Sequence, residues 1–315
     1  MPPLTSRRAV VRSAAMLGAA SALGFGRIAP ALAQATPAAS PVVSGFAHEG
    51  ILITVDAVPS QGARIAVMTP DAFNDGHIPG SHAFTEDQLA IADTSAPALE
   101  TWRAGMLETM EGVGVRPGSP TLAYDDGTMF GARVWWVLTY LGFDMPVVLD
   151  GGFAAWKAAG GEIERAMRVT VSPRPVVAGT PATPVVPTPR PEVLATKDDV
   201  LASLGKPDVV LIDTRPASDY AAGHIPGAIN LDYTANGTGG APNFWKSPED
   251  LKALYAGIGA TPDKRVIPYC HSGTKSAVTF FTLWLLGYPD AALYTGSWEE
   301  WSADPSDPVT KGSNP

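Results

Sequence analysis

The sequence predicts an α/β protein of two tandem domains, each a parallel sheet with helices on both faces. Short apolar runs, such as residues 208–213 and 265–269, alternate with helical patterns, as in a buried parallel sheet. An internal repeat gives the domain count. The motif Gly-His-Ile-Pro-Gly at residues 76–80 recurs at 223–227, an offset of 147 residues.

Further matches extend this repeat at an offset of 145 residues. Several matches at one offset, with one small change in length, indicate two homologous domains at 48–165 and 190–308, each larger than a solenoid repeat. The aligned pairs are Tyr124 with Tyr269, Asp125 with Cys270, residues 141–143 with 286–288, Gly151 with Gly296 and Trp156 with Trp301.

The N-terminal segment at residues 1–35 has the pattern of an export signal. Arg7 and Arg8 lie in Ser-Arg-Arg-Ala-Val-Val-Arg, which resembles a twin-arginine motif. Residues 14–25 are apolar but too short for a stable membrane span, and two small-x-small cleavage sites follow at 31–35. We therefore expect an exported protein, periplasmic or otherwise extracytoplasmic, with no stable membrane span.

Three connecting segments are predicted outside the domains. Residues 36–47 are rich in Pro, Ala and Ser and read as a tether. Residues 166–189 are crowded with prolines, which exclude a helix and favour an extended linker. Residues 309–315 are expected to be a tail.

Within the second domain, strands and helices are predicted to alternate. Thr196 and Asp199 have the spacing of a capping box, and Pro248 follows Ser247 at a helix start. Strands are expected at 208–213, 265–269 and 292–294, a helical turn at 219–222, a long apolar helix at 276–286 and a last helix opening at 296–298.

Cys270 is the single cysteine and lies between the strand at 265–269 and the helix at 276–286. Ligand sites in parallel sheets lie at this strand edge. Loop N–H groups and the helix dipole would stabilise a thiolate or an anion there, and Gly273 allows the tight curl that directs them inward. The polar and cationic neighbours favour a reactive cysteine over a buried, inert one.

The loop Cys-His-Ser-Gly-Thr-Lys at 270–275 resembles the active loop of the tandem-domain rhodanese, or thiosulfate sulfurtransferase, family. The two Gly-His-Ile-Pro-Gly motifs and the closing Gly-x-x-x-x-Trp resemble that family as well, so the resemblance covers nearly the whole chain after the leader. It implies a sulfurtransferase that moves sulfane sulfur from thiosulfate to cyanide or a thiol through a Cys270 persulfide. The catalytic residue it implies is Cys270, and the substrate-binding residues are Arg215, His271, Ser272, Gly273, Thr274 and Lys275.

Alternatives remain open for the function and for three residues, of which His271 could be a donor that lines the loop or simply an exposed side chain. Ser272-Gly273 resembles 3-mercaptopyruvate sulfurtransferases, whose loops usually lack a cation such as Lys275; a persulfide carrier or binding module is the third possibility. A phosphatase is disfavoured, because the related cell-cycle enzymes have Arg at the seventh loop position, which here is Ser276. Arg215 could instead form a structural ion pair with Asp213 or Asp219, and Lys275 could be a solvated residue in the first turn of a helix.

The first repeat is predicted to be non-catalytic. Asp125 stands at the position of Cys270, and residues 66–68, Ala-Val-Met, align with Asp-Thr-Arg at 213–215. The paired carboxylates of Asp125 and Asp126 would repel an anionic donor. The domain relationship accounts for these two carboxylates better than a role in acid–base catalysis does.

The net charge of the chain limits the classes of partner that it could bind. The formal charge is −9, and residues 1–35 contain four arginines and no acidic residue, so their removal leaves 18 basic and 31 acidic residues, a charge of −13. Such acidity argues against nucleic acid or an anionic membrane as a partner. We expect a monomer that acts on small-molecule donors and acceptors and uses no cofactor. His77 and His224 recur in both repeats, which indicates a structural role, and no metal-ligand cluster is evident.

Overall fold

The structure, a computed structural model, describes residues 43–144, 146–165 and 187–315. The predicted export signal at 1–35 and most of the predicted linker at 166–189 lie outside the described residues. Residues 37–315 group into one unit by their internal contacts. None of the helices in the described part combines the length and the apolar character that crossing a membrane requires.

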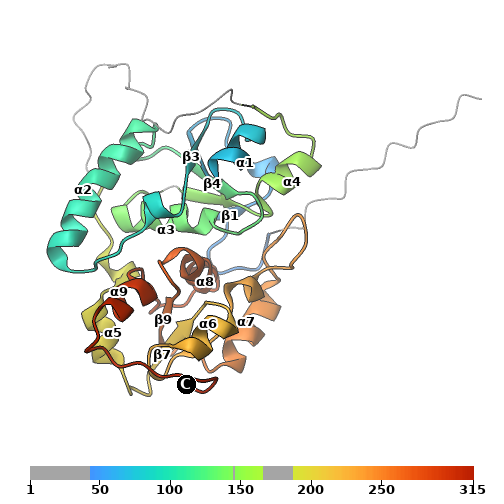
Figure 1. The fold of residues 1–315 in the computed structure, drawn as a ribbon. Coiled ribbons are helices and arrows are strands. Elements are labelled where there is room, and N and C mark those ends of the chain that lie inside the picture. Colours follow the sequence, from blue (N-terminus) through green and yellow to red (C-terminus); the bar gives the residue numbers. More distant parts are fainter. Residues whose placement is uncertain (1–42, 145, 166–186) are drawn as a thin grey trace, which may run out of the picture. The chain divides into compact units, whose positions relative to one another are not determined.

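The first repeat contains a five-stranded parallel sheet with strand order β1-β5-β4-β2-β3 (Figure 1). Alternate residues of β2 enter different apolar clusters: Ile65 packs with residues of α2 and α3, whereas Ala66 packs with residues of α1 and α4. Helices therefore cover both faces, as predicted. The elements are β1 (Leu52–Ile53), η1 (Val55–Ala57), β2 (Ala63–Val67), α1 (Pro70–Asp75), β3 (Ser81–Phe84), η2 (Asp87–Leu89), α2 (Ala96–Gly112), β4 (Thr121–Asp125), α3 (Gly131–Leu141), β5 (Pro146–Leu149) and α4 (Gly152–Ala158).

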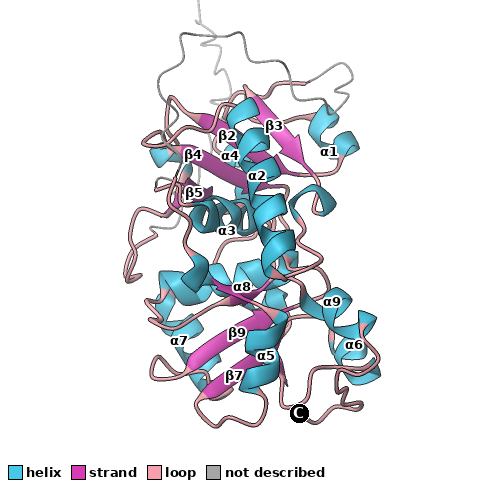
Figure 2. Ribbon diagram, turned by 90° about the vertical axis from the view of Figure 1, so that its left-hand side faces the viewer, coloured by secondary structure: helices cyan, strands magenta, loops and turns pink. Residues whose placement is uncertain are grey.

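The second repeat has the same arrangement with shorter strands. Strands β8, β7 and β9 form a parallel sheet in that order, and β10 pairs with β6 (Figure 2). A parallel bridge between Val266 and Ala291 connects the two groups of strands. The elements are η3 (Pro191–Val193), β6 (Leu194–Ala195), α5 (Lys197–Ser203), β7 (Val209–Asp213), α6 (Ala217–Ala222), β8 (Ile229–Asn230), η4 (Tyr233–Asn236), α7 (Pro248–Gly257), β9 (Arg265–Tyr269), α8 (Thr274–Leu285), β10 (Leu293–Tyr294) and α9 (Ser297–Ala303).

Local sequence signals set several of these boundaries. The capping box of Thr196 and Asp199 is present at the start of α5, and Pro248 occupies the first turn of α7. The long apolar helix begins at Thr274, two residues earlier than predicted, because Gly273 takes a left-handed conformation and ends the loop there. Thr274 and Lys275 therefore belong to the first turn of α8.

The recurring histidines have structural contacts that are the same in both repeats. The His77 ring stacks on Phe73 and the His224 ring on Tyr220, each at 3.7 Å between ring centroids. In each case Nδ1 is 2.8 Å from the backbone oxygen of the residue on which the ring stacks. Both rings are buried, so these histidines shape the turn before the following strand.

Two segments predicted to lie outside the domains, a tether and a tail, instead form contacts with the second repeat. In the tether predicted at 36–47, the described part is packed: Phe46 is buried, and the Ala47 N–H donates to Leu285 O at 2.9 Å. In the tail predicted at 309–315, Thr310 exchanges two backbone hydrogen bonds with His224. Backbone groups of the adjoining domain form hydrogen bonds with both segments, which satisfies groups that would otherwise be unpaired. Composition alone does not reveal these hydrogen bonds.

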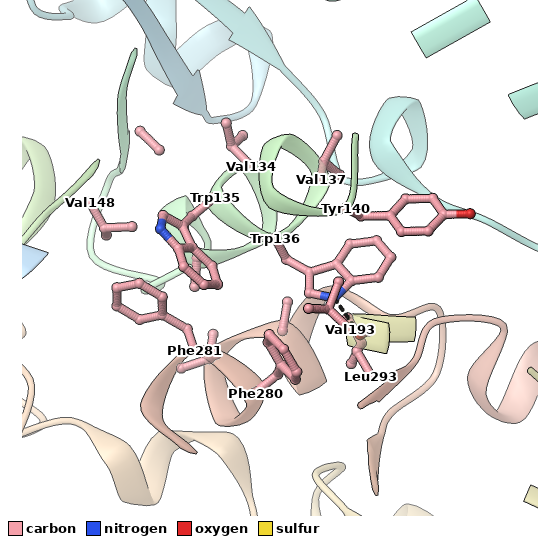
Figure 3. Packing of buried hydrophobic residues seen from close by; sticks show 14 of the residues in the cluster. Val134, Trp135, Trp136, Val137, Tyr140, Val148, Val193, Phe280, Phe281 and Leu293 are labelled. Carbon is pink, nitrogen blue, oxygen red and sulfur yellow. Dashed lines mark hydrogen bonds between the residues drawn. The ribbon is translucent and has the colours of Figure 1, made fainter. Parts of the chain in front are cut away.

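The helices α3 and α8 form an apolar core shared by the two repeats (Figure 3). The rings of Trp135 and Phe281 pack in a T-shaped arrangement with 4.9 Å between their centroids. The Trp136 indole N–H donates to Val193 O at 3.1 Å. Every residue of α3 is buried, as expected for a helix whose side chains are mostly apolar around its circumference, although Arg133 is charged. Each large apolar side chain buried here contributes about 1.5–3 kcal/mol, so this core holds the first repeat against the helix that follows Cys270.

Asp150 follows β5 and carries a buried carboxylate that joins the two repeats. Its Oδ1 accepts the Trp245 N–H at 3.0 Å. Burial raises the pKa of Asp150 to about 7, and the backbone hydrogen bonds of Trp245 and Gly151 oppose this rise. In the unfolded chain the same carboxyl group ionises near its ordinary pKa of 3.8. Between these two values the unfolded state has lost a proton that the folded state keeps, so stability falls as pH rises.

Asp150→Asn is therefore expected to reduce the loss of stability between pH 4 and pH 7. With a rise of about three pKa units at about 1.4 kcal/mol each, the upper limit of the effect is about 4 kcal/mol. Urea unfolding of wild type and variant at pH 4 and pH 8 measures it, with the exposed Asp208→Asn as the control. An equal pH dependence in wild type and Asp150→Asn would show that this carboxyl group ionises normally in the folded protein.

Candidate active site

The loop after β9 curls around the sulfur of Cys270. Cys270 is 1% exposed, and the Gly273 N–H donates to its Sγ at 3.1 Å. Gly273 has φ +92°, and a Cβ atom added there would stand 2.6 Å from Thr295 O. Only glycine combines this backbone conformation with such a close approach, so the residue is needed for the loop to close on the sulfur.

The start of α9 fixes the loop from the opposite side. The Ser297 hydroxyl accepts the Cys270 N–H at 3.1 Å and donates to Tyr294 O at 2.9 Å. The Trp298 N–H donates to Cys270 O at 3.1 Å, and the Glu299 N–H donates to His271 O at 3.0 Å. Three consecutive residues of α9 thus hold the backbone of the cysteine loop in place.

The first turn of α8 adds further donors beside the sulfur. The N–H groups of Thr274, Lys275 and Ser276 have no acceptor within the helix, because the first turn of a helix leaves its N–H groups unpaired. The hydroxyl groups of Thr274 and Ser276 are buried without a hydrogen-bond partner in the described part of the chain. Together with the helix dipole, these groups make the loop suited to hold an anion next to Cys270.

The matching loop of the first repeat already holds an anionic group, the side chain of Asp125. Its Oδ1 accepts the N–H groups of Gly127 at 2.8 Å and Met129 at 2.9 Å, and its Oδ2 accepts that of Gly131 at 3.0 Å. Burial raises the pKa of Asp125, and these three bonds lower it. The equivalent N–H groups in the second repeat, at the offset of 145, are those of Ser272, Thr274 and Ser276. The aligned loop of the first repeat therefore binds a carboxylate through its backbone N–H groups.

A cavity of about 350 Å³ lies at the carboxyl edge of the first sheet. Its lining includes Glu86, Asp87 and Asp126, and none of the described residues that line it is a lysine or arginine. Acidic groups repel an anionic donor, which agrees with the prediction that the first repeat is non-catalytic.

Arg215 has the contacts expected for a structural ion pair with Asp213. It is 3% exposed, and its Nε and Nη2 donate to the Asp213 carboxylate at 3.0 and 2.6 Å. Nη2 also donates to Gly223 O at 2.7 Å, and the guanidinium lies 4.6 Å from the ring of Trp298. Binding a donor through these groups would break a buried ion pair, which costs several kcal/mol. These contacts do not favour the predicted donor-binding role of Arg215.

The remaining predicted residues differ in their exposure. Lys275 is partly exposed, with Nζ 5.9 Å from the ring of Tyr233 in η4. Burial raises the pKa of Glu86 in the first repeat, and the charge of Lys275 lowers it, so the two side chains lie near one another. His271 is exposed and Ser272 is partly buried. Among the residues that the structure describes, no three His, Cys, Asp or Glu side chains are placed to bind a metal ion.

One residue beside the loop, Arg133 of α3, was missed by the sequence analysis. It is 0% exposed, and its Nη1 donates to Thr295 Oγ1 at 3.0 Å. Nη1 also lies 3.2 Å from the point where a Cβ atom on Gly273 would stand. The sequence did contain a signal, because Arg133 is the single charged residue between 131 and 141 and aligns with Val278.

Comparisons with known proteins agree with this arrangement. A family model described as "Rhodanese-like domain" matches residues 60–159 and 196–304. The thiosulfate sulfurtransferase of Pseudomonas aeruginosa is 32% identical over 268 residues, covering 81% of this chain and 94% of that protein. The 3-mercaptopyruvate sulfurtransferase of Escherichia coli is 31% identical over 250 residues, covering 74% and 83%.

A carrier protein and a solved structure are also similar. The sulfur carrier protein TtuD of Thermus thermophilus is 28% identical over 305 residues, covering 85% of this chain and 99% of that protein. The structure of EanB with a cysteine persulfide and ergothioneine superposes with a TM-score of 0.65 at 23% identity, covering 81% of this chain and 66% of that one. At this identity the superposition supports the fold alone.

Proposed function

Since the chain belongs to the rhodanese family and has the two domains of a sulfurtransferase, we propose that it moves sulfane sulfur from thiosulfate to cyanide or a thiol through a persulfide on Cys270. The observation that carries the proposal is the equivalence of the two loops. In the first repeat three backbone N–H groups bind the carboxylate of Asp125, and in the second repeat Cys270 occupies the aligned position and accepts the Gly273 N–H at its Sγ. A persulfide would place a terminal anionic sulfur one atom beyond Sγ, in the loop that leads to the unpaired N–H groups in the first turn of α8.

The reaction has two steps, each a displacement at sulfur. The Cys270 thiolate attacks the outer sulfur of thiosulfate, the sulfur–sulfur bond breaks, and sulfite leaves with the bonding electrons. The loop N–H groups stabilise the persulfide anion, as an oxyanion hole stabilises an oxygen. The acceptor then attacks the terminal sulfur, and Cys270 leaves as a thiolate. This is covalent catalysis with ping-pong kinetics.

The direct test compares steady-state thiocyanate formation from thiosulfate and from 3-mercaptopyruvate, with cyanide as the acceptor. We expect turnover with both donors and a higher kcat/KM with thiosulfate. A persulfide carrier without turnover would instead release one sulfur per chain and then stop. A higher kcat/KM with 3-mercaptopyruvate would show that it, and not thiosulfate, is the preferred donor. Release of a single sulfur per chain would show that the protein is a carrier and not a turnover enzyme.

Lys275 supports thiosulfate as the donor. Thiosulfate is a small dianion, and a chain with a net charge of −9 repels it unless local cations compensate. Lys275 is the partly exposed cation in the first turn of α8, within the loop region itself. 3-Mercaptopyruvate carries a single carboxylate and depends less on this charge.

Lys275→Ala is expected to lower kcat/KM for thiosulfate by about ten- to a hundred-fold, because a charge-assisted contact contributes about 1.5–3 kcal/mol. The effect on 3-mercaptopyruvate should be several-fold smaller. Both donors are measured at one ionic strength, with Lys252→Ala on the exposed side of α7 as the control. Equal losses for the two donors would contradict the assignment of thiosulfate to Lys275.

We also propose export through the twin-arginine route, which rests on the sequence pattern at residues 1–35. Replacing Arg7 and Arg8 by lysine is expected to leave unprocessed precursor in the cytoplasm, while wild type is processed and exported. Fractionation followed by immunoblotting measures both forms, with Arg27→Lys as the control outside the motif. Normal export of the double variant would remove this proposal.

A further inference from the structure

Arg133 is a buried cation that pairs with no carboxylate in the described part of the chain, whose ion pairs all involve other residues. Its hydrogen-bond partners are neutral: Thr295 Oγ1 accepts from Nη1, and Leu89 O accepts from Nη2. Its Nε is buried without a partner. Burial lowers the pKa of Arg133 to about 10, and its electrostatic interaction with Cys270 opposes this decrease. A buried charge without a counter-charge is strongly unfavourable.

The guanidinium of Arg133 lies beside the cysteine loop. Nη1 lies 3.2 Å from the Cβ position of Gly273, and the Gly273 N–H donates to Cys270 Sγ at 3.1 Å. The guanidinium carbon lies 4.8 Å from the ring of Trp136, which belongs to the apolar core between α3 and α8 (Figure 3). The apolar core excludes water here, so a negative charge on Cys270 interacts with Arg133 through a medium of low dielectric.

The repeat shows that the fold does not need an arginine at this position. Val278 in α8 is the equivalent of Arg133 in α3, and it is fully buried in the same core. An apolar side chain therefore satisfies the packing in one copy. The charged copy is the one that faces the cysteine loop of the other repeat, which indicates a role for the charge itself.

We infer that Arg133 is a positioning residue that holds negative charge on the sulfur of Cys270, so that the non-catalytic repeat completes the active centre of the catalytic one. Its guanidinium favours the thiolate before the reaction and the persulfide anion after the first step. The inference rests on the proposed function for the persulfide only, because the effect on the thiolate is measured without any donor.

Several other titratable groups surround the loop and contribute to its pH response. The charge of Lys275, in the first turn of α8, lowers the pKa of Glu86, which precedes η2. His271 lies in the loop, and Glu300 of α9 lies near Tyr294. The buried Asp213–Arg215 pair lies at the end of β7, beside β9. All of these remain in place in a variant at residue 133, so a change in the pH profile reports the guanidinium.

The experiment is the rate of Cys270 alkylation by iodoacetamide against pH, in wild type, Arg133→Gln and Arg133→Met. With one cysteine in the chain, every adduct reports this site. An opposite charge close to an ionisable group shifts its pKa by about one to three units. Gly273 separates Arg133 from the sulfur, so we expect both variants to move the midpoint upward by about one unit, the lower end of this range. Arg133→Lys should recover part of the shift, and Arg190→Gln, a half-exposed arginine over Trp284, should leave the profile unchanged.

A folded Arg133 variant with the wild-type alkylation profile overturns the inference. Two uncharged variants are made because either one could fail to fold; circular dichroism and urea unfolding identify the one to measure. The lifetime of the persulfide after thiosulfate treatment is the second readout and should fall in the same variant. Should wild type accept no sulfur, the proposed function fails, but the alkylation profile still decides the role of Arg133.

Discussion

Replacing Cys270 by serine is expected to abolish sulfur transfer completely. Cys270 is the single cysteine of the chain, so no other thiol can take its place. A serine hydroxyl is a far weaker nucleophile at neutral pH and forms no persulfide. Intact-protein mass spectrometry after treatment with thiosulfate should show one added sulfur atom in wild type and none in Cys270→Ser. Thiocyanate formation should fall to the uncatalysed rate.

Moving the cysteine to the first repeat is the matched control for this prediction. The double variant Asp125→Cys, Cys270→Ser keeps one thiol in an equivalent loop, but Glu86, Asp87 and Asp126 remain at the adjoining cavity. We expect no turnover, because these carboxylates repel an anionic donor. An unchanged mass of wild type would contradict the persulfide mechanism, and substantial turnover in the double variant would show that the first repeat is competent.

Gly273→Ala is expected to lower kcat/KM by about 10²- to 10³-fold, the loss typical of removing one oxyanion-hole donor. A Cβ atom at residue 273 would stand 2.6 Å from the backbone oxygen of Thr295 and 3.2 Å from Arg133 Nη1, and both residues are fully buried. The backbone must therefore move, and the hydrogen bond from residue 273 to the sulfur is lost with it. Kinetics with thiosulfate and cyanide measure the effect.

Gly205→Ala isolates the contribution of backbone strain. Gly205 has φ +73°, similar to the +92° of Gly273, but no atom lies within 4 Å of its Cβ position. Both variants incur the cost of a left-handed residue, about 1–2 kcal/mol, and both should be less stable than wild type. Activity should fall only in Gly273→Ala. Wild-type kcat/KM in that variant would mean that the close contact with Thr295 does not govern the loop.

The sequence predicted those features that depend on order along the chain. The offset of 145 residues located the second domain and the pairing of Asp125 with Cys270. Apolar runs located the central strands, and the comparisons confirm the α/β fold and the rhodanese family. These inferences succeeded because they use neighbouring residues or two copies of one pattern.

The features that the sequence did not predict depend on side chains that meet from distant parts of the chain. Ser297 supports Cys270 from 27 residues away, and Arg133 contacts Thr295 from 162 residues away. For Arg215 the sequence offered both donor binding and an ion pair with Asp213, and a motif does not say toward which acceptor a guanidinium turns. Asp213 is two residues away, and it supplies a bidentate partner in a buried site.

The side chain of Asp125 gives the two loops different dependences on solution conditions. A carboxylate joined covalently to its own loop cannot dissociate, so the occupancy of the first loop is complete at any concentration of donor. In the proposed reaction, the occupancy of the second loop is set by the supply of donor and acceptor. By mass action, a group that binds only the folded state adds stability that grows with its occupancy. Because the two repeats share one apolar core, a group held at the second loop would stabilise both of them together.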